Sequence, residues 1–161
     1  LIYGTIGSPK LMPRLAEYED FGDEVRGAIE GINDAIKKSP GDAKLYADLG
    51  TAYNALQKFV EAREAFRAAV LLSKGNPDYI MALGRAEMAA ADGQVNDAAK
   101  KAFEMVLLQD KTNLMARYYL ALGKKQSGDS AAARRDFEGI LKDLPEGIPL
   151  RGIIEREMKE E

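Results

Sequence analysis

Residues 43–76 have the sequence AKLYADLGTAYNALQKFVEAREAFRAAVLLSKGN, and two short patterns in this stretch decide the fold. The first is Leu49-Gly50 followed three residues later by Tyr53, and the second is Ala62 followed four residues later by Phe66. Both spacings bring the paired residues onto one face of a helix. Small residues at such positions let two helices approach closely, and the large ones fill the remaining space. The stretch therefore predicts two packed helices joined by a turn.

Both patterns recur further along the chain. The Ala/Phe pair returns as Ala99/Phe103 and Ala133/Phe137, at intervals of 37 and then 34 residues. The Leu-small pair returns as Leu83-Gly84 and Leu120-Ala121, at intervals of 34 and then 37 residues. A single insertion between Gly84 and Ala99 explains both irregular intervals. Because two independent sets of markers agree, the chain is predicted to contain three copies of one helix pair.

This 34-residue pattern resembles the tetratricopeptide repeat (TPR), in which each unit is a helix A, a turn and a helix B. The resemblance implies an all-α fold, a right-handed superhelix of three TPR helix pairs. We place the repeats at residues 43–76, 77–113 and 114–147.

Helices at both ends are expected to cap the repeats, because the terminal units of a repeat protein expose apolar faces. Residues 23–42 carry isoleucines and a valine at helical spacing and end in a Ser-Pro-Gly-Asp turn, so we expect an N-terminal capping helix there. Residues 148–161 contain Ile153, Ile154 and Met158 and are expected to form the C-terminal capping helix. Residues 1–22, which contain several Gly and Pro residues, are expected to form an irregular lead.

The amino-acid composition excludes several kinds of catalytic and metal site. The 161 residues include no Cys, no His and no Trp, so a thiol nucleophile, a Ser-His triad and a His/Cys metal site are all impossible. We therefore expect no enzyme, no catalytic residue, no metal and no cofactor. The formal net charge of -3 argues against general binding to nucleic acid, which requires a basic excess.

In a superhelix of this kind, the concave surface is lined mainly by the first helix of each repeat. Positions spaced i, i+3, i+7 and i+10 on those helices form one face, which the sequence fills with the following residues: Lys44, Ala47, Thr51, Asn54, Asp78, Met81, Arg85, Met88, Met115, Tyr118, Leu122 and Lys125. Three Met residues with Tyr118 and Leu122 make this face apolar. Adaptable Met surfaces suit amphipathic helices, so we predict a groove that binds a helical peptide. The alternative is that some of these Met residues are buried by the C-terminal segment or by ordinary helix packing.

One known use of TPR domains is not supported. TPR domains that clamp the C-terminal carboxylates of cytosolic chaperones carry Lys and Asn on the first helix A, where this chain has Ala47 and Thr51. A two-carboxylate clamp is therefore not expected. Lys44, Asn54, Arg85 and Lys125 remain available to meet a carboxylate in another geometry.

A closer resemblance covers nearly the whole chain. It rests on the lead Tyr3…Gly7-Ser8-Pro9…Pro13-Arg14-Leu15, on the insertion in the second repeat, and on residues 113–145, NLMARYYLALGKKQSGDSAAARRDFEGILKDLP. In this order the features resemble the periplasmic TPR domain of the CcmI (CycH) family of c-type cytochrome biogenesis factors. That resemblance implies a domain anchored in the bacterial inner membrane by preceding helices, with Leu1-Ile2-Tyr3 at the exit of the last span.

The resemblance also implies partners. The TPR groove would capture the C-terminal helix of apocytochrome c and leave its haem-binding CxxCH segment free for subunits of the haem ligation complex. A second hypothesis stays open, that of a general TPR scaffold whose groove takes a different peptide in another envelope or cytosolic assembly. A third, an enzyme, has only carboxylates in its favour.

Overall fold

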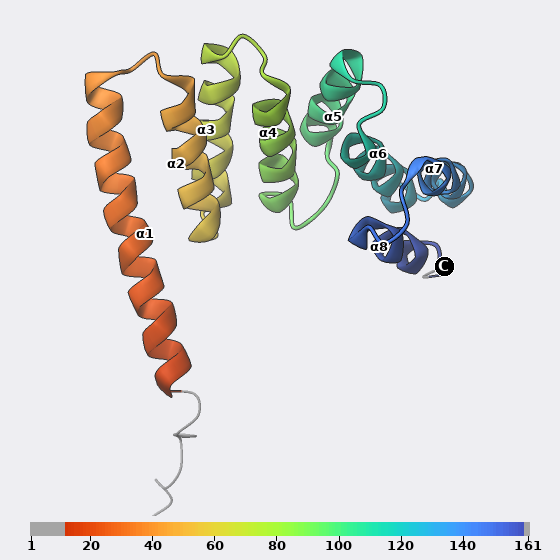
Figure 1. The fold of residues 1–161 in the computed structure, drawn as a ribbon, viewed down its shortest axis with the longest axis horizontal. Coiled ribbons are helices and arrows are strands. Elements are labelled where there is room, and N and C mark those ends of the chain that lie inside the picture. The colour runs from red at the N-terminus through yellow and green to blue at the C-terminus, as the bar shows by residue number, and fades with distance from the viewer. Residues whose placement is uncertain (1–11, 160–161) are drawn as a thin grey trace, which may run out of the picture.

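The computed structural model describes residues 12–159, and every element of regular secondary structure in this part is a helix (Figure 1). The helices are α1 (Met12–Lys38), α2 (Ala43–Ala55), α3 (Phe59–Leu72), α4 (Pro77–Ala89), α5 (Asp97–Gln109), α6 (Leu114–Gln126), α7 (Ser130–Asp143) and α8 (Pro149–Glu157). The pairs α2/α3, α4/α5 and α6/α7 are three TPR units, stacked side by side with a capping helix at each end. The predicted superhelix of three TPR helix pairs is confirmed.

Short polar side chains begin most of these helices. An Asp or Asn precedes five of them and accepts a hydrogen bond from a backbone N–H of the first turn, which satisfies a donor that the helix itself leaves free. Glycines with positive φ follow helices at Gly75, Gly93 and Gly128, where the chain reverses. Gln57 takes the corresponding turn in the first repeat, with a φ of 57° that suits glycine better.

Three clusters of buried side chains form the core, and each contains one of the repeated phenylalanines. Phe66, Phe103 and Phe137 are 4%, 0% and 1% exposed. The cluster of Phe66 includes Ala86 of α4, and the cluster of Phe103 includes Ala116 of α6. The core therefore runs continuously from one repeat into the next.

The two repeated glycines are needed where helix A meets helix B. A Cβ atom at Gly84 would lie 2.6 Å from the Phe103 ring, and one at Gly50 would lie 2.9 Å from the Phe66 ring. Real Cβ contacts are longer, so these glycines allow the phenylalanines to approach. In the third repeat Ala121 holds this position and is fully buried, so its methyl group is accommodated there.

One charged side chain among the described residues is buried, and it lies between the first two repeats. Glu87 of α4 is 4% exposed. Its Oε1 accepts a hydrogen bond of 2.9 Å from Arg67 Nη2, and its Oε2 lies 3.6 Å from Arg63 Nη1. Two cations from α3 thus neutralise a buried carboxylate on α4, as a buried charge requires.

The insertion in the second repeat lies in the turn between its two helices. Residues 90–96 connect α4 to α5, whereas residues 56–58 and 127–129 make the corresponding turns of the other repeats. Gln126 fixes this longer loop from the third repeat: its Oε1 accepts from the backbone N–H of Val95, and its Nε2 donates to the carbonyl of Gly93. The loop is therefore ordered against α6.

The N-terminal cap is longer than predicted. Residues 12–22 belong to α1, so the expectation of an irregular lead is wrong for them, and residues 1–11 lie outside the described part of the chain. Pro13 lies in the first turn of α1, where a helix tolerates proline, and isolated Gly22 does not interrupt it. Figure 1 shows α1 lying beside α2 and reaching well beyond it.

The C-terminal cap α8 lies on the inner side of the curve that the helices follow, beside α6 and α7 (Figure 1). Ile154 is fully buried and Leu150 is 8% exposed, both in the cluster of Phe137. Arg151 Nη2 donates to the carbonyl oxygens of Leu141 and Leu144 at 3.0 and 2.9 Å, which ties the start of α8 to the end of α7. Within residues 12–159, no helix combines the length and apolar character that crossing a membrane requires.

Candidate functional site

Part of the predicted binding face on the third repeat lies under α8. Tyr118 is 8% exposed, and Leu122 packs against the same cluster, which includes Leu150 and Ile154 of α8. The Tyr118 ring also lies 6.0 Å from the Phe137 ring, centroid to centroid. α8 therefore covers Tyr118 and part of Leu122, two residues of the predicted face.

Lys125 completes this contact with two hydrogen bonds to α8. Its Nζ donates to the backbone carbonyl oxygen of Glu157 at 2.5 Å and to Oε2 of the same residue at 3.0 Å. The two side chains are 21% and 24% exposed, so the pair is mostly shielded from water. Lys125 thus holds the last turn of α8 on α6.

Tyr118 is affected by the same environment. Burial raises the pKa of its phenol above the ordinary value of 10.0, and the negative charge of Glu157 raises it further. Arg156 opposes this shift in the pKa with its positive charge. The charge of Glu157 on α8 thus adds to an effect that burial causes in the first place.

The second repeat presents a more open part of the face on α4. Met81 and Met88 are half-buried and pack against the cluster of Phe103, which leaves part of each side chain at the surface. Asp78 and Arg85 are exposed, and neither has an ion pair among the residues that the structure describes. Met115, at the start of α6, is 38% exposed. These side chains remain available to a partner.

The first repeat contributes polar groups, some of them already engaged. Lys44 is exposed and its Nζ donates to Asp48 Oδ2 at 2.6 Å; this hydrogen bond and the charge of Asp48 raise the pKa of Lys44. Thr51 Oγ1 donates to the carbonyl oxygen of Ala47, which is buried. The Oδ1 atom of Asn54 is buried and has no hydrogen-bond partner in the described residues.

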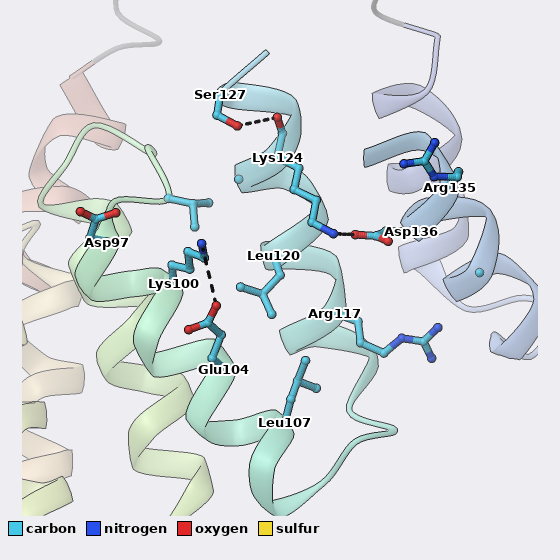
Figure 2. Close-up of a pocket in the computed structure, with 13 residues that line it drawn as sticks. Asp97, Lys100, Glu104, Leu107, Arg117, Leu120, Lys124, Ser127, Arg135 and Asp136 are labelled. Atoms are coloured by element: carbon cyan, nitrogen blue, oxygen red, sulfur yellow. Dashed lines mark hydrogen bonds and ion pairs between the residues drawn. The ribbon is translucent and has the colours of Figure 1, made fainter. Parts of the chain in front are cut away.

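A separate pocket of about 640 Å³ lies between α5, α6 and α7 (Figure 2). Its lining comprises Val95, Asp97, Lys100, Glu104, Leu107, Arg117, Leu120, Gly123, Lys124, Ser127, Arg135, Asp136 and Gly139. Leu107 and Leu120 form an apolar part, and charged side chains surround them. Lys124 Nζ lies 2.5 Å from Asp136 Oδ2, which links α6 to α7 across the pocket.

This pocket lies on the opposite side of α6 from the predicted face. At 3.6 residues per turn, the pocket residue Leu120 lies nearly half a turn around α6 from Tyr118 and Lys125. The sequence pattern did not reveal the pocket, because Leu120 belongs to a repeat marker and predicts packing. The spacing of Arg117, Leu120 and Lys124 does place them on one helix face, but a chemical role is not implied by that spacing alone.

Comparison with known proteins identifies relatives over nearly the whole chain. The family model described as "Cytochrome c-type biogenesis protein H TPR domain" matches residues 9–150. Two curated relatives are described as cytochrome c-type biogenesis protein CycH. The relative from Bradyrhizobium diazoefficiens is 26% identical over 160 residues, which cover 96% of this chain and 43% of the relative. The relative from Rhizobium meliloti is 27% identical over 161 residues, covering 99% and 42%. The chain thus spans less than half the length of these relatives.

Solved structures support the fold alone. The crystal structure of MamA has a TM-score of 0.65 and 21% identity, and the match covers 88% of this chain and 75% of MamA. A tetratricopeptide repeat protein from Parabacteroides merdae has a TM-score of 0.70 and 20% identity, with 94% of this chain and 59% of that protein covered. Both matches agree with the TPR architecture described above.

Proposed function

This chain belongs to the family of TPR domains of cytochrome c-type biogenesis protein H, and from that premise we propose that it holds the client of c-type cytochrome maturation. The client is the C-terminal helix of apocytochrome c, bound on the face that α2, α4 and α6 share. The domain presents the client for haem ligation and leaves the CxxCH segment free. Its role is binding, so it has no catalytic residue and no cofactor.

The observation that carries this proposal is the surface of α4. Met81 and Met88 leave part of their side chains uncovered, while Asp78 and Arg85 on the same helix face have no ion pair among the described residues. A methionine surface flanked by unpaired charges of both signs suits an amphipathic helix, with the apolar face on the methionines and polar side chains beside them. Flexible methionines also adapt to several related helices, as a protein serving more than one cytochrome needs.

The cellular location that we propose follows from the same family. We propose that the domain works in the periplasm as part of a longer protein that an N-terminal segment anchors in the inner membrane. The curated relatives are more than twice as long as this chain, which leaves room in such proteins for an anchor and for further domains.

Haem ligation subunits need a surface that the client leaves free. We propose the pocket between α5, α6 and α7 for this second contact, because it lies on the opposite side of α6. Its rim carries both signs of charge and Arg135 has no ion pair among the described residues. This mixture suits a protein partner and not a phosphate backbone.

The test is a titration of the domain with a labelled peptide of the C-terminal helix of a cognate apocytochrome c. We expect saturable binding that Arg85→Glu and Met81→Asp each weaken about tenfold, the effect of losing about 1.4 kcal/mol of contact. Met105→Asp is a matched control, since Met105 is 45% exposed on α5, away from the proposed face. Absence of saturable binding to the wild-type domain would refute the proposal. Equal loss in the control would refute the assignment of the face, and binding of an unrelated helix with equal affinity would favour a general TPR scaffold.

A further inference from the structure

α8 occupies the proposed client face as a helix of the chain itself. Leu150 and Ile154, spaced i and i+4, are buried against the cluster that contains Tyr118. This is how an amphipathic helix binds in an apolar groove. The contact shows which chemistry this end of the face accepts, namely an apolar helix stripe over Tyr118 and Leu122, and a negative group near Lys125.

Lys125 makes its contact with the end of a helix. The last carbonyl groups of a helix have no partner within it and carry partial negative charge, so a cation is favourable there and a carboxylate is not. Lys125 Nζ binds both the carbonyl oxygen and the side-chain carboxylate of Glu157, the last residue of α8. One ammonium group thus satisfies a helix C-terminus and the acidic group that lies beside it.

We propose that Lys125 is the anchor for the C-terminal end of the client helix and that α8 occupies this place until the client displaces it. A protein's own C-terminal helix ends in a free α-carboxylate next to its last carbonyl groups, which is the pair of acceptors that Glu157 presents to Lys125. The inference rests on the proposed function and adds to it the polarity of the bound helix and the group that is recognised.

α8 is suited to being displaced. It has nine residues, too few for a helix that is stable by itself in water. Two of its side chains, Leu150 and Ile154, are buried, whereas the link to α7 at residues 145–148 is exposed. A longer client helix can bury the same surface of α6 and extend along α4, so it gains contacts that α8 does not make.

The experiment compares two forms of the same client peptide, one with a free C-terminal carboxylate and one amidated. We expect the wild-type domain to bind the free acid about tenfold more tightly, the usual effect of one charge-assisted hydrogen bond. In Lys125→Gln this preference falls to about one. Lys124→Gln is the matched control, because the neighbouring Lys124 pairs with Asp136 on the other side of α6, and it keeps the preference.

A second variant tests the competition. Glu157→Gln removes the negative charge that α8 offers to Lys125, so α8 is held less tightly and both peptides bind about fivefold better. Hydrogen exchange at the amides of α8 reports its release when the peptide binds.

The possible results of these experiments distinguish the inference about Lys125 and α8 from the proposed function. Equal binding of acid and amide by the wild-type domain, or full protection of the α8 amides in the complex, overturns this inference while the proposed function stands. Absence of binding by the wild-type domain and by Glu157→Gln refutes the proposed function itself.

Discussion

Replacing Gly84 by alanine tests whether the repeated glycines set the distance between helices. The new Cβ would lie 2.6 Å from Cε1 and 3.0 Å from Cζ of Phe103, and 3.1 Å from the Cβ of Ala102. Phe103 is fully buried and stacks on Tyr119, with ring centroids 4.7 Å apart, so its ring has no free space to move into. The substitution must therefore push α4 away from α5.

The magnitude follows from two opposing effects. Overpacking a well-filled core costs about 1–3 kcal/mol. Alanine is more favourable than glycine inside a helix by about 1 kcal/mol, which offsets part of that cost. We expect a net loss of up to about 2 kcal/mol in the free energy of unfolding, and a decrease in Tm of up to about 8 °C for a domain of this size.

Denaturant and thermal unfolding measure this loss, with Gly31→Ala as the control. A Cβ at Gly31, on the exposed part of α1, meets nothing within 4 Å, so this variant should gain about 0.5–1 kcal/mol from helix propensity alone. In a Phe103→Leu background the cost of Gly84→Ala should decrease, because the clashing ring is gone. If Gly84→Ala gains as much stability as Gly31→Ala, the close approach does not limit the packing.

Three further predictions concern other parts of the fold. Gln57→Gly should stabilise the domain by about 0.5–1 kcal/mol, because glycine adopts the positive φ of this turn without strain; an unchanged denaturation midpoint would contradict this. Glu87→Ala should cost about 1.5–3 kcal/mol by removing the charged partner of Arg67 between the first two repeats; a cost equal to that of removing an exposed acid such as Asp78 would show that burial adds nothing. The pKa of Tyr118 is raised, so its contribution to stability is complete below about pH 10 and is lost as the pH rises through its value in the folded state. Unfolding measured at alkaline pH should show a steeper loss for the wild type than for Tyr118→Phe, and parallel curves would place Tyr118 in water.

The resemblance in the sequence led to the correct family, and the reason is physical. Repeats must present the same small and large residues wherever two helices meet, so a marker set such as Gly50 and Phe66 returns at a fixed period. The family match over residues 9–150 and the TPR architecture confirm that interpretation. The start of α1 was less predictable. The glycines and prolines of residues 1–22 suggested irregular structure, although Pro13 is compatible with the first turn of a helix.

The candidate site was predicted less completely. Helical spacing correctly places Met81, Arg85 and Met88 on one face of α4, because spacing is a property of the helix. It did not show that Tyr118 is buried, since the cover comes from α8, more than 30 residues further along the chain. The role of each residue on the face remains a proposal.

By itself, the sequence determined the helix pairs, their number, their family and the chemistry that is excluded by the lack of Cys and His, because periodicity and composition are properties of the chain. Only the tertiary structure decided which part of the face is open. The sequence places Lys125 on a predicted groove, but only the folded chain brings Glu157 into contact with it. The pocket around Leu120 likewise forms only where α5, α6 and α7 meet. Contacts between distant helices depend on how the repeats stack, and no local pattern in the sequence encodes that geometry.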